Sequence, residues 1–434
     1  MPPKKKDKGA EKTPAPKAAP TVVASDGKTV NKAAAFLAQI KKEYKGEAQM
    51  SLASESSQTY LKRLATGILT LDLETRGGLP AAGITQLIGA KNAGKSYLAW
   101  CVAKELQRRK GQNASVLLAM TEMAADRDQA RKCGVKIGYS EDEIAKLSKG
   151  RAALGKPPFT EPELAVLRET IGTFHEVAGI DGETLYDIII KAVEQDVYDL
   201  IIIDSVGNVM TREEAEDTTV AANHYGGSSK INTKLVHKLT PLLMLRTADG
   251  EIRDPWIIGI NQVRDAIGDP NKEYKAPGGN AFAHAKFLDI FVRSGKSLGD
   301  HVPYDTPEGK KQKFVVTGKE VTWKIEKGKA GMHEGGAGQY QYLYEDNSVN
   351  HYVDTLVGGL KTNVIHQSGS WLAVPDPEVP GNFIIREQSR DAFLTAMKND
   401  YLAASAAGVP DQSILRRIYY MALNAAGIDP NYGW

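Results

Sequence analysis

The stretch Leu87-Ile88-Gly89-Ala90-Lys91-Asn92-Ala93-Gly94-Lys95-Ser96 decides the fold expected for this chain of 434 residues. An apolar run at residues 84–88 predicts a buried strand, and residues 97–109 follow with the apolar spacing of a helix. A Gly-x-x-x-x-Gly-Lys-Ser pattern between a strand and a helix is typical of a phosphate-binding loop, because its glycines let backbone N–H groups curl toward phosphate oxygens. A glycine-rich turn with a chance lysine is the alternative, and the flanking strand and helix disfavour it.

The loop predicts a site for a nucleoside triphosphate and its magnesium ion. Lys95 would reach the β- and γ-phosphates, and the Ser96 hydroxyl would ligate Mg²⁺. The following helix would add the positive end of its dipole. The residues expected to surround the nucleotide here are Gly89, Ala90, Lys91, Asn92, Ala93, Gly94, Lys95, Ser96 and Tyr97.

Composition excludes several classes of protein. Apolar residues make up 42% and charged residues 25%, as in an ordinary globular protein, and no run of 18 apolar residues predicts a membrane span. The lysine-rich start has no apolar stretch behind it, so no signal peptide is expected. The two cysteines, Cys101 and Cys133, lie on apolar helical patterns, which favours a reducing compartment. A net charge of +2 means that any nucleic-acid site must be a local patch.

The chain begins with two segments that precede the core. Residues 1–30 are rich in lysine, proline and alanine and predict a disordered basic tail, either solubilising or an arm that contacts DNA or serves as an address. Residues 31–60 include a helix at 31–44 with a narrow apolar face formed by Phe36, Leu37, Ile40 and Tyr44. Either a neighbouring subunit or the chain's own core would cover that face.

Residues 61–346 predict an α/β core with an insertion, and residues 347–434 a mostly helical C-terminal module. The insertion at 136–181 carries two capping boxes, Ser140/Glu143 and Thr160/Glu163, each opening a helix. It is either a partner-binding hairpin or lid or, more in keeping with its lack of chemistry, a passive elaboration. Trp371 lies in a short predicted strand of the C-terminal module.

Buried strands in the core end in polar residues that point to chemistry. The strand at 114–121 ends in Glu122, that at 198–203 in Asp204, and that at 256–260 in Asn261-Gln262. A carboxylate after a buried strand beside a phosphate loop suits a magnesium site, so Ser96 and Asp204 are the predicted metal residues. Polar segments at 211–229 and 263–280 predict mobile loops at the same edge. Later strands are expected at 287–293, 314–317, 321–326 and 340–344, with a lysine-rich hairpin formed by the second and third.

Six motifs follow one another along the chain: Leu64-Ala65-Thr66-Gly67, Gly77-Gly78-Leu79-Pro80, Thr121-Glu122-Met123-Ala124-Ala125-Asp126, Ile260-Asn261-Gln262-Val263-Arg264, Gly278-Gly279-Asn280-Ala281 and Lys327-Gly328-Lys329. In their order and spacing, these segments resemble the bacterial RecA recombinase family, including its phage-encoded branch. The resemblance covers most of the chain and implies an α/β fold, a P-loop NTPase RecA-like core in which a mostly parallel twisted sheet has helices on both faces. It also implies an N-terminal polymerisation helix and a small α/β C-terminal domain. The insertion and the basic tail depart from the cellular pattern and lean towards phage.

The resemblance implies roles for individual residues. Glu122 would be the base that activates the attacking water, and Gln262 would sense the γ-phosphate. Lys327 and Lys329 would reach into a neighbour's nucleotide. The catalytic set is thus Glu122, Lys95, Gln262, Lys327 and Lys329, and Asp126 and Gln129 would lie at the adenine, with Gln129 where the family usually has a stacking aromatic residue.

The two polar loops are the implied DNA-binding elements. Tyr225 would stack on a base, Ile267 would wedge between bases, and Lys230 and Arg264 would hold phosphates. Three carboxylates in the second loop, at positions 265, 269 and 273, oppose phosphate binding and have no explanation in the sequence. The predicted DNA-binding residues are His224, Tyr225, Gly226, Gly227, Lys230, Arg264, Ile267, Gly278, Gly279 and Asn280.

The resulting expectation is a DNA-dependent ATPase that forms helical filaments on single-stranded DNA and exchanges strands with a homologous duplex. ATP and Mg²⁺ are the expected cofactors, with further copies of the chain, single-strand-binding proteins and mediator proteins as partners. The cytoplasm of a bacterial or phage-infected cell is the expected location. A hexameric helicase-type motor with the same core is one alternative. A DNA-coating structural filament is another, although Glu122 argues against it because such a filament needs no base there.

Overall fold

The computed structural model divides the chain into two units, Met1–Thr59 and Tyr60–Trp434, which are described separately. In the first unit, β1 (Thr21–Val23) pairs antiparallel with β2 (Thr29–Asn31). Residues 36, 39, 42 and 43 are helical, and Phe36 is 52% exposed within this chain. The residues that the structure describes are 21–23, 29–31, 36, 39, 42–43, 62–121, 127–216, 227–244, 254–265, 274–275, 286–306, 309–345 and 348–429.

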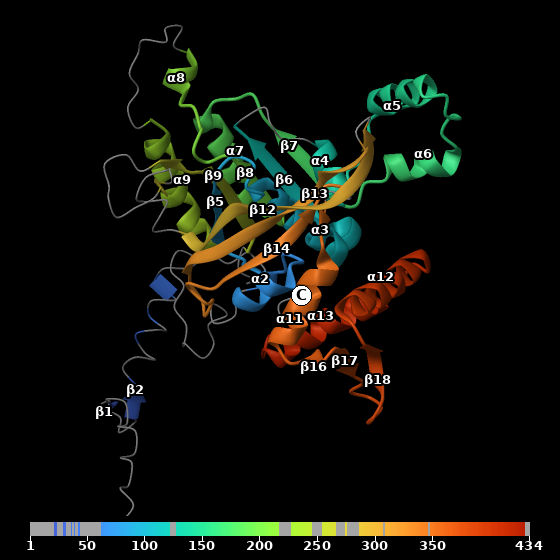
Figure 1. The fold of residues 1–434 in the computed structure, drawn as a ribbon. Helices are drawn as coiled ribbons and strands as arrows, with labels where there is room; N and C mark the ends of the chain where they lie inside the picture. Colours follow the sequence, from blue (N-terminus) through green and yellow to red (C-terminus); the bar gives the residue numbers. More distant parts are fainter. Residues whose placement is uncertain are drawn as a thin grey trace, which may run out of the picture. The chain divides into compact units, whose positions relative to one another are not determined.

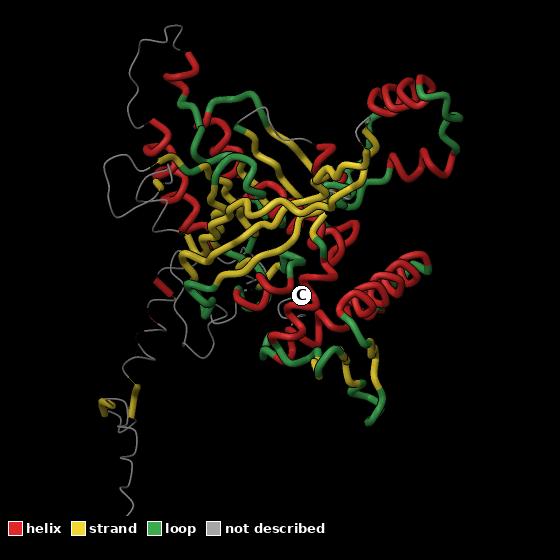
Figure 2. The backbone as a smooth tube through the Cα atoms, in the orientation of Figure 1, coloured by secondary structure: helices red, strands yellow, loops and turns green. Residues whose placement is uncertain are grey.

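A nine-stranded sheet organises the second unit (Figures 1 and 2). Six neighbouring strands are parallel, and three more continue the sheet antiparallel on the β12 side. This arrangement is the mostly parallel α/β core that the sequence predicts. In spatial order the strands are β15 (Ser348–Val349), β14 (Ala337–Leu343), β13 (Gly309–Gly328), β12 (Lys286–Thr306), β5 (Gly83–Gly89), β9 (Trp256–Gln262), β8 (Leu200–Asp204), β6 (Ser115–Met120) and β7 (Thr173–Val177).

Helices cover both faces of the parallel strands. Leu200 and Ile202 of β8 pack in one hydrophobic cluster with α3 (Lys95–Lys110) and α4 (Arg127–Lys132). The alternating residues Ile201 and Ile203 pack in a second cluster with α7 (Gly182–Glu194) and α9 (Gly227–Met244). Successive strand residues point to opposite faces, so a continuous apolar strand needs cover on both sides.

The insertion forms two helices, α5 (Glu141–Ala153) and α6 (Glu161–Arg168), which project from the sheet in Figure 1. Both predicted capping boxes are present: Ser140 and Thr160 each accept a hydrogen bond from the backbone three residues on, and each glutamate bonds back. Arg168 pairs with Glu141 across the two helices at 2.8 Å. The helices are therefore locally specified, while Leu154 on the connecting turn stays 74% exposed.

The predicted hairpin between residues 314–317 and 321–326 is wrong. Both segments belong to the single strand β13, whose antiparallel partner is β12. Gly318, at the centre of the expected turn, lies within the strand beside β14, where a Cβ would stand 2.3 Å from the carbonyl oxygen of Tyr342. The glycine serves a close backbone approach, and the turn that sequence reasoning assigned to it does not exist.

The predicted loop at 211–229 is also partly wrong. A short helix, α8 (Arg212–Glu216), occupies its start, and α9 already begins at Gly227, so Gly227 and the exposed Lys230 are helical. Thr211 and Glu214 form a local turn, with the Thr211 amide donating to Glu214 Oε2 at 2.8 Å. This side-chain bond organises a segment whose polarity alone suggests a loop.

The C-terminal module packs three helices and a small antiparallel sheet around its own apolar cluster. Phe393, Met397, Ile418 and Ala422 are fully buried there, and Leu69 of the core segment joins them. The elements are α11 (His351–Lys361), β16 (His366–Ser368), β17 (Trp371–Pro375), β18 (Phe383–Glu387), α12 (Arg390–Ala406) and α13 (Ile414–Ala425).

Other short elements of the core are β3 (Arg63–Leu64), α2 (Leu69–Glu74), β4 (Leu79–Pro80), β10 (Arg264–Asp265) and β11 (Tyr274–Lys275).

Buried polar contacts fasten this module to the core. Glu105 of α3, on the helix that follows the phosphate loop, pairs with Arg416 of α13 at 2.9 Å and with Arg108 at 2.7 Å. Burial alone would raise the pKa of Glu105, but the two guanidinium groups lower it overall. Asp72 accepts a hydrogen bond from the Tyr419 hydroxyl at 2.6 Å. The module is thus anchored directly to the helix that carries Lys95.

No helix within the described part of the chain is both long and apolar enough to cross a membrane. Cys101 and Cys133 are both buried as free thiols, and burial raises the pKa of Cys101 to about 11. Neither thiol is therefore poised for reaction.

Replacing Gly318 by alanine should destabilise the fold through the clash with the Tyr342 carbonyl. We expect a loss of roughly 1–3 kcal/mol in the free energy of unfolding, measured by denaturant titration. Gly150→Ala in α5 is the matched control, because a Cβ there meets nothing within 4 Å and a helix interior favours alanine. Equal stability of the two variants would contradict the close approach.

His351 should make the fold less stable as the pH falls from 7 to 5. The ring donates through Nδ1 to the Gly67 carbonyl at 3.0 Å, and burial, followed by the charges of Lys104 and Arg416, lowers its pKa to about 3. The unfolded chain therefore binds more protons between pH 6.5 and 3, so stability falls as the pH drops through that range.

The comparison with His351→Gln isolates this contribution, because glutamine keeps a donor for Gly67 but does not titrate. Burial raises the pKa of Asp72 to about 7, which acts in the opposite direction in both proteins and cancels in the difference. We expect the wild type to lose about 1–2 kcal/mol more than the variant between pH 7 and pH 5. Parallel pH profiles of the unfolding midpoint would contradict a buried neutral histidine.

Candidate nucleotide-binding site

The phosphate loop runs from the end of β5 into α3 and folds as an anion cradle. Asn92 and Gly94 have φ of 60° and 108°, so the chain turns sharply, and Gly94 supplies the left-handed conformation that side chains disfavour. Lys95 is only 6% exposed, and its ammonium donates to the Ala90 carbonyl at 2.7 Å across the loop. The amine is therefore held where phosphate oxygens would lie, next to the first turn of α3.

Ser96 and Asp204 meet beside this lysine. The Ser96 hydroxyl donates to Asp204 Oδ2 at 3.0 Å, which joins α3 to the end of β8. One hydroxyl and one carboxylate oxygen are ligands suited to Mg²⁺, which usually keeps waters and phosphate oxygens for its other positions. No group of three or more His, Cys, Asp or Glu among the described residues could hold a metal alone. The pair therefore fits a magnesium ion that arrives with a triphosphate.

The strands place further predicted residues near the loop. Gln262, the last residue of β9, pairs in register with Gly89, and the Val263 amide donates to the Gly89 carbonyl at 3.3 Å. Thr121, directly after β6, donates from its amide to the Asp204 carbonyl at 2.9 Å. Gln262 is thereby level with the start of the phosphate loop, and its role as a sensor of the γ-phosphate stays a prediction.

A cavity of about 450 Å³ extends from the loop toward β13 and β14. Its lining includes the predicted Gln129, and the described fold adds residues that sequence reasoning did not assign to the site. Lys319 of β13 donates to the Asn92 carbonyl at 2.6 Å. Val321 of β13 also lines the cavity, as do Tyr340 and Tyr342, which alternate along β14 and share one face of it, and Tyr344, which follows the strand.

The tyrosines give the cavity an aromatic wall that remains neutral. Burial raises the pKa of Tyr342 to about 12, and its ring packs edge-on against Tyr97 at 4.6 Å between centroids. The buried Tyr340 hydroxyl has no hydrogen-bond partner among the described residues, and a Cβ on Gly94 would lie only 3.3 Å from it. The period-two tyrosine pattern was the available sequence signal, but only the sheet places it opposite the loop.

Lys327 and Lys329 lie at the other end of the sheet. In the strand register, Lys327 of β13 lies opposite Asp289 of β12, which lies opposite Gln86 of β5. Gln86 is three residues before the loop begins at Gly89. Burial and then the charge of Lys329 lower the pKa of Lys327. The structure therefore does not bring these two lysines to the phosphate loop of their own chain.

The turn that follows these lysines is held rigidly. Arg63 donates to the Ala330 carbonyl at 2.8 Å, and Arg76 donates to the Gly331 carbonyl at 3.2 Å. Glu74, whose side chain is largely buried, pairs with both His333 of the turn and Lys361 of α11. The lysine pair is thus presented from a fixed scaffold that also touches the C-terminal module.

Several predicted residues lie outside the described part of the chain. They include Glu122 and Asp126 of the nucleotide site and most of the DNA-binding set. Of Arg264 only the backbone, in β10, is described. The DNA-binding residues that fall outside are His224, Tyr225, Gly226, Ile267, Gly278, Gly279 and Asn280.

Replacing Lys319 by methionine should weaken nucleoside triphosphate binding about tenfold, because a cation facing a bound phosphate is lost while the stem is kept. Burial lowers the pKa of Lys319, which marks a partly desolvated ammonium. Lys324→Met on the same strand is the control, since its side chain is exposed and outside the cavity. Equal affinities by fluorescent-nucleotide titration would remove Lys319 from the site.

Comparisons with known proteins agree with this geometry. The RecA N-terminal domain family matches residues 30–154. Protein RecA of Oleidesulfovibrio alaskensis is 26% identical over 343 residues, covering 78% of this chain and 80% of that protein. Protein RecA of Leptospira biflexa is 23% identical over 362 residues, covering 83% and 78%. With the parallel core and the phosphate loop in place, these matches support a resemblance to RecA-type recombinases, at 23–26% identity to the relatives and with the family model matching residues 30–154.

Proposed function

We propose that this protein is an ATP-dependent strand-exchange recombinase that assembles as a helical filament on single-stranded DNA and hydrolyses ATP between subunits. The observation that carries the proposal is the separation of two phosphate-binding elements within one chain. The phosphate loop lies at the carboxyl end of β5, and the Lys327–Lys329 pair lies toward its amino end. Each element is half of a site that a second copy would complete.

The strand register gives the distance between the phosphate loop and the Lys327–Lys329 pair along the sheet. Gly328 is level with Leu288 and, through it, with Thr85, four residues before Gly89. At about 3.3 Å per residue this is roughly 13 Å along the sheet, and the loop continues away beyond Gly89. A lysine side chain does not span that distance. If these lysines act on a nucleotide, it is the nucleotide of a neighbouring chain.

The Lys327–Lys329 pair is suited to binding the triphosphate of a neighbouring chain. Burial and then repulsion from Lys329 lower the pKa of Lys327, so its charged form is disfavoured in the absence of an anion. An incoming triphosphate would relieve the repulsion, so nucleotide binding would tighten the contact between copies. Positive groups donated from a neighbour stabilise charge on the transferred phosphoryl group and contribute about 10³–10⁵ in rate in other nucleotide hydrolases.

The remaining groups act from within the chain. Lys95 and the first turn of α3 would hold the β- and γ-phosphates, and Ser96 with Asp204 would hold Mg²⁺. Bound magnesium would neutralise charge on the phosphate oxygens. Glu122 would orient or deprotonate the attacking water, and the tyrosine wall of the 450 Å³ cavity would pack against the base in place of the aromatic residue missing at Gln129.

DNA would be coupled to the nucleotide through the sheet. β8 and β9 are adjacent parallel strands, so the segments that follow them leave from the same edge as the phosphate loop. Gln262 ends β9 in register with Gly89, and the second predicted DNA loop begins two residues later. A change at the γ-phosphate would therefore reach the DNA-binding segment through one strand end, and the single- and double-stranded partners would bind there.

Mixing two inactive variants tests the shared site. Lys95→Ala removes the phosphate loop's lysine, and the double variant Lys327→Ala/Lys329→Ala removes the donated pair. Each alone should lose DNA-stimulated hydrolysis. An equimolar mixture should regain about a quarter of wild-type activity, because about one interface in four then combines an intact loop with an intact pair.

The double variant alone should still bind nucleotide as a monomer, since its own loop is untouched. A double variant that hydrolyses ATP at the wild-type rate, or a mixture with no recovered activity, would overturn the cross-subunit arrangement. Electron micrographs on single-stranded DNA with a non-hydrolysable ATP analogue distinguish the alternatives. Closed rings would favour a helicase-type motor, and a filament with no turnover would favour a structural coat.

A further inference from the structure

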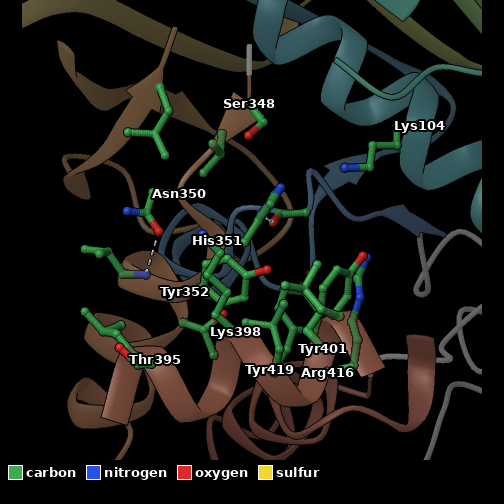
Figure 3. Close-up of a pocket in the computed structure, with 18 residues that line it drawn as sticks. Lys104, Ser348, Asn350, His351, Tyr352, Thr395, Lys398, Tyr401, Arg416 and Tyr419 are labelled. Atoms are coloured by element: carbon green, nitrogen blue, oxygen red, sulfur yellow. Dashed lines mark hydrogen bonds between the residues drawn. The ribbon is translucent and has the colours of Figure 1, made fainter. Parts of the chain in front are cut away.

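A second cavity lies between the core and the C-terminal module (Figure 3). Its volume is about 530 Å³, which falls within the usual range of small-molecule sites and far exceeds the space of a simple ion. Lys104 of α3 and Gly67 contribute from the core, and the first turn of α11 with faces of α12 and α13 contributes from the module. We call this space the junction cavity. It is separate from the cavity beside the phosphate loop, with which it shares no lining residue.

The charged side chains that line the junction cavity are all positive. Lys104, Lys398 and Arg416 line it, and no aspartate or glutamate does. Glu105 neutralises Arg416 but also pairs with Arg108, whereas neither Lys104 nor Lys398 has an ion-pair partner in the described ranges. Unbalanced cations around a concave space favour an anionic ligand.

Two further features of the wall favour an anion. The first turn of α11 faces the cavity, with Asn350 as its cap, so the positive end of that helix dipole adds to the lysines. Figure 3 shows the Lys104 amine directed toward the His351 ring, with Arg416 and Tyr419 on the facing side. Burial lowers the pKa of His351 most, and the positive charges of Lys104 and Arg416 lower it further, so the ring stays neutral beside them.

The rest of the lining favours a ligand that has an organic part as well as a charged one. Tyr352 and Tyr401 form an edge-on aromatic pair 6.2 Å apart in the wall, and Leu343 and Leu415 add aliphatic surface. The Tyr419 hydroxyl is already used by Asp72, so this residue presents its ring. Aromatic rings, aliphatic surface and two ammonium groups without ion-pair partners in one partly open cavity match a phosphorylated nucleoside, whose base is flat and whose phosphate is charged.

We propose that the junction cavity binds a nucleoside phosphate at a site distinct from the phosphate loop. Such a ligand would bridge Lys104 on α3 and Lys398 on α12 and so fasten the module to the helix that begins at Lys95. The site would be regulatory rather than catalytic, because none of the residues that hold the hydrolysed nucleotide lines it. The proposal does not depend on strand exchange or on filament assembly.

The experiment uses the full chain with Lys95→Ala, so that binding at the phosphate loop is removed. Isothermal titration with AMP should show one site per chain, and adenosine and inorganic phosphate should each bind at least tenfold more weakly than AMP, since each lacks half of the recognised chemistry. Adding Lys398→Gln should weaken AMP binding about tenfold, and adding Lys104→Gln should weaken it further. Lys149→Gln on α5, an exposed lysine outside the cavity, should change nothing.

Several results would overturn the proposal. They are the absence of AMP binding at millimolar concentration, phosphate binding as tight as AMP binding, and an AMP affinity unaffected by Lys398→Gln. Lys398 is exposed, so its replacement does not threaten the fold and this last result cannot be attributed to misfolding. A duplex oligonucleotide that binds through Lys104 and Lys398 while AMP does not would also overturn it and would assign the lysines to DNA.

Discussion

Parallel strand pairing is the constraint on which this site depends. Because β6, β8, β9 and β5 run in the same direction, all four end at one edge of the sheet, and whatever follows each strand is gathered there. Ser96, Asp204 and Gln262 come from positions far apart in the chain, yet strand pairing and the Ser96–Asp204 side-chain hydrogen bond place them within one neighbourhood. The chemistry of the loop needs this convergence, since a lysine and a hydroxyl alone can hold a phosphate but cannot position a water or report on hydrolysis.

The same pairing excludes other groups from the site. β12 is parallel to β5, and β13 returns antiparallel, so the residues at the end of β13 are carried to the amino edge of the sheet. Lys319, earlier on β13, reaches the phosphate loop instead. One strand thus places Lys319 at the phosphate loop of its own chain and carries Lys327 near its end. In the proposed filament this strand would serve two nucleotides and would link neighbouring sites mechanically.

Sequence reasoning identified the elements better than it identified their long-range partners. The phosphate loop, the two capping boxes and the apolar strands are local patterns, and each is confirmed. Gly318 was misread because a glycine required by a neighbouring strand resembles a glycine required by a turn. Lys319 and Tyr342 were missed as site residues for a related reason: their positions depend on which strands pair, and that pairing joins segments more than 200 residues apart in the sequence.

The attachment of the C-terminal module gives α3 a role beyond phosphate binding. Its first turn holds Lys95 and Ser96, its middle holds Glu105 against Arg416, and Lys104 beside Glu105 faces the junction cavity. A helix is stiff over this length, so any displacement that a bound nucleotide imposed at its start would be carried to the module that contacts α3 at Glu105. Removing Arg416 would leave the buried Glu105 with Arg108 alone, and an undercompensated buried charge is costly. The ion pair therefore couples the position of the module to that of the phosphate loop. If the two moved apart, the Glu105 carboxylate would lose Arg416 as its partner.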